Sequence, residues 1–285
     1  MSKPSPTPLA GRTAVITGAG SGIGRSLAQR LSAHGCPLAL LDTDSESLAA
    51  TAALLDAPML VRTLDVRDRD GLFAFAEELR QWSLAPIGAV FNNAGVTLGS
   101  PIVGASPEHD ERVFAINFGG VVNGVQAFLP ILLAQRDGAM VNTSSIFGLV
   151  GVRDQAAYCA SKFAVRGYTD GLRQELLGSG VRAIVVHPGG IKTNIFRSAH
   201  MHADLDDGRT PDERAAAFNA RVRTTPEQAA ETIHRGVDDG KVRILVGRDA
   251  YVVDALARIT PANAVRILAG LERLGARRAR RTANS

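Results

Sequence analysis

Short apolar runs alternate with segments of helical periodicity along nearly all of the 285 residues. The runs are continuously apolar, which is typical of strands buried on both faces. This alternation predicts an α/β protein with a doubly wound Rossmann fold, in which helices cover both faces of a seven-stranded parallel sheet. The predicted strands are 13–17, 37–41, 59–64, 88–92, 139–144, 181–187 and 242–246.

The segments between these runs have apolar residues at helical spacing. We predict helices at 23–34, 44–55, 68–82, 107–134 and 155–177, another that begins at Pro226, and shorter ones up to residue 274. Pro226 suits the first turn of a helix, where its missing N–H leaves no bond unmade.

One domain accounts for the chain, because a single core can serve up to about 250 residues. We expect a disordered Pro-rich leader at 1–10, a catalytic domain at 11–260, and a C-terminal helix with a basic tail at 261–285. The polar stretch 194–223 is longer than an ordinary connection, so it is expected to be functional or disordered.

The positive charge is concentrated at the C-terminus. The last fifteen residues hold five Arg and one Glu, which equals the whole net charge of +4. The rest of the chain, residues 1–270, therefore has no net charge, which does not favour nucleic-acid binding, and the tail lacks aromatic residues for base stacking. We expect the tail to be a solvated helix end, although a basic segment can also touch anionic surfaces.

Cysteine usage and hydropathy indicate a soluble cytoplasmic protein. Cys36 and Cys159 are isolated, as in a reducing compartment. The first eleven residues have no apolar core of a signal peptide, and we expect no membrane span. No metal site is expected, because His200 and His202 are two apart in a polar loop and do not have ligand spacing.

A glycine-rich turn follows the first predicted strand and opens the first helix. Glycines at 18, 22 and 24 leave out the Cβ atoms that would block a tight turn, and the N–H groups at the start of the helix favour an anion. In this position the turn predicts a pyrophosphate site for a dinucleotide, whereas the alternative is an ordinary tight turn. The residues expected at the cofactor are Gly18, Ser21, Gly22, Ile23 and Gly24.

An acidic residue, Asp42, ends the second strand about twenty residues downstream of this turn. A carboxylate there can accept both hydroxyls of an adenosine ribose and repels a 2′-phosphate. Thr43 follows it, and no basic residue does, so NAD is expected over NADP. Arg25 lies nearby in sequence and keeps NADP open, and Asp42 could alternatively cap the next helix.

Further motifs appear in a fixed order after the glycine turn: Asn92-Asn93-Ala94-Gly95, Asn117, Ser145 thirteen residues before Tyr158, Tyr158-x-x-x-Lys162, and Pro188-Gly189 with Thr193. With these motifs the chain closely resembles the short-chain dehydrogenase/reductase family over residues 11–195. The resemblance implies a nicotinamide cofactor, a substrate lid at 194–223, and a homodimer or homotetramer formed through the long helices.

The Tyr158 and Lys162 pair has a chemical reading of its own. A tyrosine hydroxyl is a poor base because its reference pKa is about 10, and a nearby cation favours the phenolate. Residues four apart on a helix are neighbours, so we expect Lys162 to lower the Tyr158 pKa. Ser145 can orient a substrate oxygen through its hydroxyl. Ser144 competes for this role, and the thirteen-residue spacing favours Ser145.

The resemblance extends these roles to other residues. It implies that Lys162 also holds the nicotinamide ribose and that Asn117 orders a water beside Lys162; the alternative is a structural role for Asn117. Asp65 is placed near the adenine, or else it caps a helix. Asn92 and Asn93 are expected to tie strands together. The remaining cofactor residues implied are Val66, Asn93, Ala94, Gly95, Pro188, Gly189, Ile191 and Thr193.

We therefore expect an oxidoreductase that transfers a hydride between NAD and an alcohol or ketone, with Tyr158 as general acid and base. A non-catalytic nucleotide sensor on the same fold is the alternative, although no catalytic group is missing. Apolar residues such as Ile146, Val96 and Leu98 favour a lipophilic substrate. Arg153 and Gln155 add a polar anchor, which leaves a carboxylated substrate open. The expected substrate residues are Ser145, Phe147, Arg153, Gln155 and Tyr158.

Overall fold

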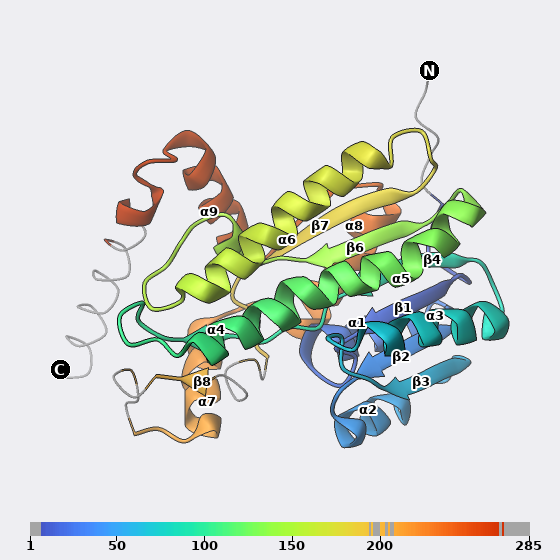
Figure 1. Cartoon of the computed structure of the whole chain (residues 1–285), viewed down its shortest axis with the longest axis horizontal. Coiled ribbons are helices and arrows are strands. Elements are labelled where there is room, and N and C mark those ends of the chain that lie inside the picture. The colour runs from blue at the N-terminus through green and yellow to red at the C-terminus, as the bar shows by residue number, and fades with distance from the viewer. Residues whose placement is uncertain are drawn as a thin grey trace.

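A seven-stranded, all-parallel sheet forms the centre of the protein (Figure 1). The computed structural model describes residues 7–193, 195, 200–202, 205, 208–267 and 270. The strand order is β3-β2-β1-β4-β6-β7-β9, so the winding direction reverses between β1 and β4. Each strand end lies within one residue of its predicted position: β1 (Thr13–Thr17), β2 (Leu38–Asp42), β3 (Met59–Thr63), β4 (Ile87–Asn92), β6 (Ala139–Thr143), β7 (Arg182–Pro188) and β9 (Arg243–Val246).

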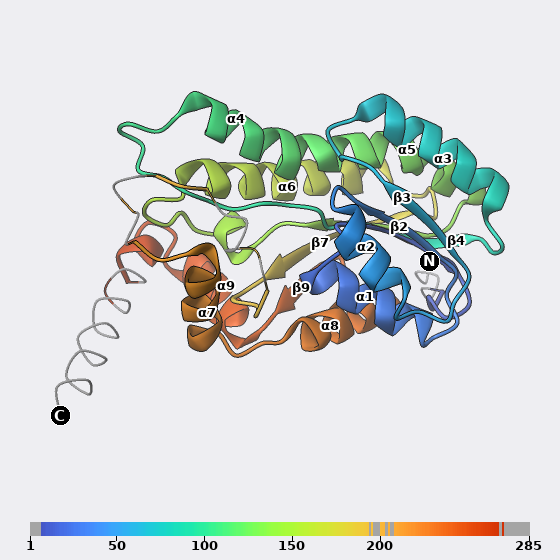
Figure 2. The same cartoon turned by 90° about the horizontal axis from the view of Figure 1, so that it is seen from below.

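Helices cover both faces of the sheet, which confirms the doubly wound fold and the single domain (Figure 2). On one face lie α3 (Arg69–Trp82), α5 (Gly120–Gln135) and α6 (Ala156–Glu175). On the other lie α1 (Gly22–Ser32), α2 (Ser45–Ala52) and α8 (Pro226–Asp238). The remaining described helices are α4 (Pro107–Phe114), α7 (Pro211–Arg221) and α9 (Arg248–Ile259).

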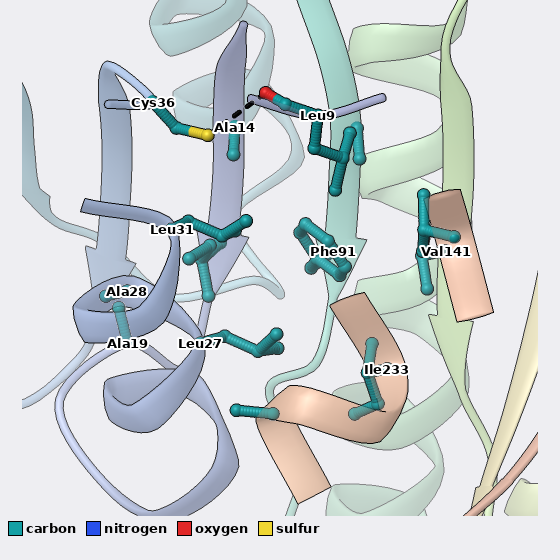
Figure 3. Close-up of a cluster of buried hydrophobic side chains, with 14 of the residues drawn as sticks. Leu9, Ala14, Ala19, Leu27, Ala28, Leu31, Cys36, Phe91, Val141 and Ile233 are labelled. Carbon is teal, nitrogen blue, oxygen red and sulfur yellow. Dashed lines mark hydrogen bonds between the residues drawn. The ribbon is translucent and has the colours of Figure 1, made fainter. Parts of the chain in front are cut away.

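Successive side chains of each strand enter opposite layers, and this explains why the strands are continuously apolar. On β4, Phe91 packs with Leu27 of α1 and Ile233 of α8, whereas Val90 belongs to the opposite cluster (Figure 3). Both residues are fully buried or nearly so. Period-two alternation is absent because helices cover both faces of the sheet, and only the edge strand β3 ends in exposed residues, Arg62 and Thr63.

The long helix predicted at 107–134 is instead interrupted by a π-helical segment, η1 (Ala115–Gly119), between α4 and α5. Extra residues in a helical turn are frequent at functional sites, and here the segment holds Asn117 in a fully buried position. The stretch Pro107–Gln135 is long and apolar enough to cross a membrane by length and composition alone. Half of an apolar 18-residue window within it is buried inside the protein, as in the core helix of a soluble protein.

Two segments differ from the sequence-based expectation. The polar stretch 194–223 contains α7, which begins with a capping box formed by Thr210 and Glu213. The Thr-x-x-Glu pattern signals the start of a helix, but the prediction for 194–223 did not include one. A small parallel pair, β5 (Leu98–Gly99) and β8 (His200–Met201), joins this region to the loop after β4.

The two ends of the chain are described only in part. The expected leader does not extend to its predicted end, because Leu9 is fully buried and its N–H donates to Asp238 at 2.9 Å. Residues 1–6 and the arginine-rich tail at 271–285 lie outside the described residues.

Candidate active site

A cavity of about 990 Å³ opens at the carboxyl ends of the central strands. It lies where the winding direction reverses between β1 and β4, the position at which open parallel sheets bind their ligands. Its wall contains the glycine turn after β1, the ends of β2, β4, β6 and β7, and part of α6. The cavity therefore collects residues that are far apart in the sequence.

The glycine turn forms one end of this cavity. Gly18 and Gly22 have positive φ angles of 68° and 50°, and a Cβ added at Gly18 would lie 2.9 Å from Ala94 Cα. Ser21 precedes α1 without using its side chain as a cap, and it lines the cavity together with Ile23. The turn thus leaves room and free N–H groups for an anion at the start of α1.

Gly24 meets only one of the two roles expected of it, the close packing of the turn. It is absent from the cavity wall, and a Cβ at this position would overlap the carbonyl of Gly18. Its small size lets α1 pack against the turn rather than letting a ligand approach. The spacing of the glycines alone could not separate these two demands.

Asp42 lies at the cavity wall with its carboxylate held by backbone donors. Its Oδ2 accepts from Gly20 N at 2.8 Å and its Oδ1 from Asp44 N at 3.1 Å. Arg25 does not extend into the cavity, because it donates to the hydroxyl of Thr51 at 2.9 Å and to the carbonyl of Ser47 at 3.2 Å. The acidic group is therefore presented to a ligand while the nearest cation joins the turn to α2.

Asp65 also lines the cavity, but an arginine that the sequence reading missed occupies its carboxylate. Arg67 Nη2 and Nε donate to Asp65 Oδ2 at 2.6 and 2.9 Å. These bonds hold the pKa of Asp65 below its usual value. Val66 contributes the next part of the wall, and Arg112 adds a second cation there.

Asn93, Ala94 and Gly95 line the cavity next to the glycine turn. The hydroxyl of Thr17 accepts from the backbone N–H groups of Asn93 and Ala94, both at 3.0 Å. The Asn93 side chain donates to the carbonyl of Thr17 at 3.1 Å, and Asn92 donates to Asn142 on β6 at 2.8 Å. The expected role of the two asparagines in tying strands together is confirmed.

Tyr158, Lys162 and Ser145 meet at one wall of the cavity. Lys162 Nζ lies 5.9 Å from the centre of the Tyr158 ring and donates to the carbonyl of Thr143 at 3.1 Å. Ser145 follows β6 and caps a short turn by accepting from Phe147 N at 3.1 Å. Ser144 instead donates to the carbonyl of Lys162 at 2.8 Å, so the structure favours Ser145 over Ser144 as the serine available to a ligand.

Asn117 lies behind this wall and does not line the cavity. Its amide bridges the backbone of Val96, with Oδ1 accepting from N at 2.8 Å and Nδ2 donating to O at 3.0 Å. A Cβ added at Gly95 would lie 3.0 Å from Asn117 Oδ1 and 3.3 Å from Lys162 Nζ, so both side chains flank Gly95. These bonds give Asn117 a structural role, and the residue also lies close to Lys162.

Burial governs the ionisation of the central pair. It raises the pKa of Tyr158 to about 12, and a hydrogen bond with Ser145 offsets this only in part. Burial also lowers the pKa of Lys162 to about 8. The expectation that Lys162 depresses the Tyr158 pKa is therefore not met, because the removal of the phenolate from water dominates the shift.

The segment after β7 forms another part of the cavity wall, and its Thr193 lies next to Gly22 of the glycine turn. Pro188, Gly189, Ile191 and Thr193 line the cavity as expected. Asp249, at the start of α9, also lines the cavity and accepts from Gly190 N at 2.6 Å. A single Asp at the start of a helix has no sequence signature of its own, so only the packing of α9 against this loop shows its position.

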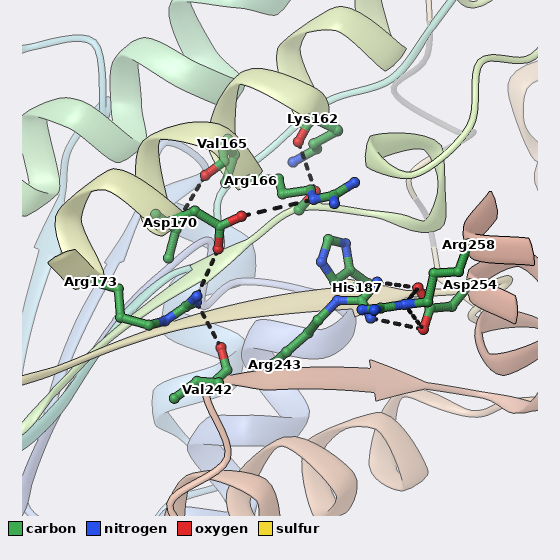
Figure 4. Close-up of polar contacts among 12 residues, drawn as sticks. Lys162, Val165, Arg166, Asp170, Arg173, His187, Val242, Arg243, Asp254 and Arg258 are labelled. Atoms are coloured by element: carbon green, nitrogen blue, oxygen red, sulfur yellow. Dashed lines mark hydrogen bonds and ion pairs between the residues drawn. The ribbon is translucent and has the colours of Figure 1, made fainter. Parts of the chain in front are cut away.

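His187 supports the site from below the cavity. It is fully buried, and its Nδ1 lies 3.0 Å from the carbonyl oxygen of Ser145. Burial lowers its pKa to about 4. Behind it, Arg243 of β9 pairs with Asp254 of α9, as Figure 4 shows.

The expected substrate residues divide into two groups. Phe147 and Gln155 line the cavity, and the Phe147 ring packs edge-to-face on Tyr158 with centroids 6.3 Å apart. Arg153 is not brought into it: its side chain is 91% exposed and pairs with Asp154 at 3.3 Å. Three residues from the region expected to form a lid also line the cavity and were not singled out from the sequence: Ile195, Phe218 and Val222.

Among the described residues, no group of three His, Cys, Asp or Glu side chains is arranged to hold a metal ion.

Comparison with known proteins agrees with this geometry. A family model described as short chain dehydrogenase matches residues 12–204. A Mycobacterium tuberculosis protein named as an oxidoreductase, SadH, is 44% identical, and the match covers 91% of this chain and 94% of that protein. Levodione reductase from Leifsonia aquatica is 33% identical over 77% of this chain and 85% of its own.

Solved structures with the same fold contain nicotinamide dinucleotides. A short chain dehydrogenase/reductase from Burkholderia phymatum in complex with NAD has a TM-score of 0.77 and 29% identity, covering 88% of this chain and 94% of that one. A short chain dehydrogenase from Burkholderia cenocepacia in complex with NADP has a TM-score of 0.72, covering 90% and 96%. At 22% identity, this second likeness concerns the fold alone.

Proposed function

The chain belongs to the short-chain dehydrogenase/reductase family, and from that premise we propose that it interconverts an alcohol and a ketone with Tyr158 as the proton carrier. A nicotinamide cofactor and an oxidoreductase activity are what the family supports. The observation that carries the finer proposal is the meeting of Tyr158, Ser145 and Lys162 at one wall of a cavity whose other end is the glycine turn.

The residues present fit such a cofactor. A Cβ at Gly18 would press on Ala94 and one at Gly22 on Thr193, so both glycines keep the wall beside the turn close-packed, and α1 begins there with the N–H groups that favour an anion. When bound, the nicotinamide supplies or accepts the hydride. Ser145 orients the substrate oxygen, and Tyr158 gives a proton to that oxygen or takes one from it. Lys162 provides the adjacent positive charge.

The raised pKa of Tyr158 favours one direction at neutral pH. With a pKa of about 12, the hydroxyl is protonated and can donate to a carbonyl oxygen. Alcohol oxidation needs the phenolate. Below the pKa of Tyr158, the phenolate population grows about tenfold for each unit by which the pH increases. We therefore propose that ketone reduction is favoured near neutral pH.

The test of this function is Tyr158→Phe, assayed by NADH absorbance with a panel of ketones and alcohols. We expect turnover to fall by at least about a hundredfold, the usual contribution of a positioned acid or base. NADH binding, measured by fluorescence, should remain. Tyr251→Phe is the matched control, because Tyr251 is 61% exposed on α9 and should keep full activity. Full activity in Tyr158→Phe would refute the assignment, and NADH binding without any turnover by the natural protein would favour a nucleotide sensor.

For the cofactor we propose NAD over NADP, on the basis of Asp42. Its carboxylate faces the cavity, and Arg25 is engaged with the turn and α2. Asp42→Ala should raise the preference for NADP relative to NAD by at least about tenfold, since a like charge beside a phosphate costs several kcal/mol. The kcat/KM values for the two cofactors measure this. Asp56→Ala is the control, because Asp56 is an exposed loop residue outside the cavity wall.

We also propose that the protein acts in the cytoplasm as a homodimer or homotetramer, without a nucleic-acid partner. Two free, buried cysteines suit a reducing compartment. The long helices α5 and α6 offer extended surfaces for subunit contact. Light scattering after size-exclusion chromatography tests the oligomeric state, and a monomeric mass would contradict it.

A further inference from the structure

Asp249 brings a carboxylate to the candidate active site from outside the motifs that mark most of the cavity wall. It lies in the first turn of α9, after Gly247, whose φ of 93° turns the chain from β9 into the helix. Asp249 Oδ2 accepts from Gly190 N at 2.6 Å, and so short a bond is typical of an ionised acceptor. A Cβ added at Gly189 would overlap the Asp249 carboxylate, so this group packs directly against the backbone after β7.

The segment that Asp249 contacts, 188–193, runs from the serine of the reacting centre to the glycine turn. At its start, the neighbouring His187 places Nδ1 3.0 Å from the carbonyl oxygen of Ser145. At its end, a Cβ added at Gly22 would lie 3.1 Å from a methyl carbon of Thr193. The segment therefore spans the wall between the serine and the expected pyrophosphate site.

A dinucleotide that joins these two places lays its nicotinamide half along the same wall. The hydride must pass close to the groups that hold the substrate oxygen, Tyr158 and Ser145, whereas the pyrophosphate is expected at the start of α1. Gly190 lies in the middle of the segment between them, and Asp249 is bonded to it. The Asp249 carboxylate therefore belongs to the nicotinamide half of the site.

Few other charged side chains share this half. Most of the described charged residues in the cavity wall come from the ends of β2 and β3 and from α4, on the other side of the glycine turn: Asp42, Asp44, Asp65, Arg67 and Arg112. Lys162 and Asp249 are the remaining two, and Lys162 Nζ donates to the carbonyl of Thr143. Within the described part of the chain, Asp249 has no cationic partner, so its negative charge is not neutralised by the protein.

The packing of α9 fixes the position of this charge. Asp254, further along the helix, accepts from Arg243 Nη1 of β9 at 2.8 Å, which ties the helix to the sheet (Figure 4). On the inner side of α9, Val253 is buried in one apolar cluster with Ile146, the residue after the serine. A charge held in place before a ligand binds acts on it without a cost of reorganisation.

We propose that Asp249 stabilises the positive charge of the oxidised nicotinamide ring and thereby favours hydride donation by the bound cofactor. The inference rests on the proposed function. In ketone reduction a hydride, one hydrogen with two electrons, passes from the reduced cofactor to the carbonyl carbon, and Tyr158 gives a proton to the carbonyl oxygen. The ring is neutral before this transfer and carries one positive charge after it, so a fixed carboxylate nearby favours the state after the transfer.

Asp249→Asn tests the charge, because the amide oxygen can still accept from Gly190 N. The dissociation constants of oxidised NAD and of NADH are measured by calorimetry with no substrate present. Oxidised NAD should bind about three- to tenfold more weakly than to the natural protein, whereas the affinity for NADH should change by less than about twofold. Asp239→Asn is the matched control: it makes the same change in net charge at an exposed residue that lines no part of the cavity, and both affinities should stay unchanged.

Asp249→Ala separates the charge from the position of the backbone. This variant also loses the bond to Gly190, so both forms of the cofactor should bind more weakly, by at least about threefold for NADH. The ratio of the two affinities should change as it does in Asp249→Asn. A ratio that stays unchanged in Asp249→Asn, whether or not both forms bind more weakly, would overturn the proposal and leave Asp249 with a positioning role only.

A measurement with substrate distinguishes this inference from the proposed function. With enzyme in excess of cofactor and a saturating ketone and alcohol pair, NADH absorbance reports the ratio of the two bound states. Asp249→Asn should shift this ratio toward NADH by about three- to tenfold. If no ketone or alcohol reacts but the binding ratio changes as expected, the proposed function fails and the role of Asp249 stands. If the natural protein turns over and neither ratio changes in Asp249→Asn, the function stands and this inference fails.

Discussion

Ser145 depends on a residue that never reaches the cavity. His187 lies beneath it, fully buried, with Nδ1 3.0 Å from the Ser145 carbonyl. That carbonyl accepts only if Nδ1 carries a proton, which fixes the tautomer of the neutral ring. His187 therefore supports the backbone turn that presents Ser145. The preceding serine, Ser144, instead bonds to α6 through the carbonyl of Lys162.

A pH-dependent stability follows from the burial of His187. Its pKa is about 4 in the folded protein, against 6.5 for an ordinary histidine. Below the higher value the unfolded chain binds a proton that the folded protein does not, so stability falls as pH decreases through this window. We expect this group to account for a loss of about 3 kcal/mol between the two values. Urea unfolding across the window measures it.

The comparison with His187→Gln isolates the effect from that of the carboxylates. The variant should be less stable at neutral pH but should lose less stability on acidification than the natural protein. His109→Gln, a change on α4 away from Ser145, should keep the natural pH profile. An unchanged profile in His187→Gln would show that another group is responsible.

At the level of elements, the contact between α1 and the turn after β1 sets how closely the helix end approaches the cavity. Gly24 lies on α1 against the Gly18 carbonyl, where no Cβ fits. Gly171 on α6 has open space around the position of a Cβ. The same residue type thus has opposite consequences on two helices.

We expect Gly24→Ala to destabilise the protein by about 1–3 kcal/mol, because the added methyl group must displace α1 or the turn. Gly171→Ala should instead stabilise it by up to about 1 kcal/mol, the difference in helix propensity. Thermal unfolding measures both. NADH affinity should fall only in Gly24→Ala, since α1 carries the N–H groups that face the cavity. Similar effects of the two changes would contradict this account.

For the whole molecule, the sheet holds two helical layers together through side chains that alternate between them. Phe91 on β4 packs between α1 and α8, close to the centre of the strand order (Figure 3). The cavity lies at the end of the same strands. Global stability and the geometry of the site therefore depend on the same packing.

Phe91→Ala should lower the free energy of unfolding by about 3–5 kcal/mol, because the methyl group left in place cannot fill the space of a buried ring. This is a large part of the 5–15 kcal/mol that is typical of folded proteins. Phe73→Ala, at a position 38% exposed on α3, should cost less than about 1.5 kcal/mol, including its contact with Arg69. Denaturant unfolding of the two variants checks the contrast.

The sequence by itself determined the sheet, its helices and most of the cavity wall. Continuous apolar runs identify buried parallel strands, and motifs at strand ends meet because all carboxyl ends share one edge. Local signals do not report distant packing, and this explains the differences. Gly24 serves a helix contact rather than a ligand, and Asp249 reaches the cavity from an element that has no motif.

Only the tertiary structure decided the pKa values of Tyr158 and Lys162 and which polar side chains line the cavity. The spacing of Tyr158 and Lys162 indicates their proximity, but burial from every side sets the two pKa values. Gln155 and Arg153 are two residues apart and looked equivalent in sequence. The left-handed backbone at Asp154 and its bond to Ser100 separate them, with Gln155 inside and Arg153 in solvent. The sequence thus determined which residues gather at the site, and three-dimensional packing decided which of them a ligand can reach.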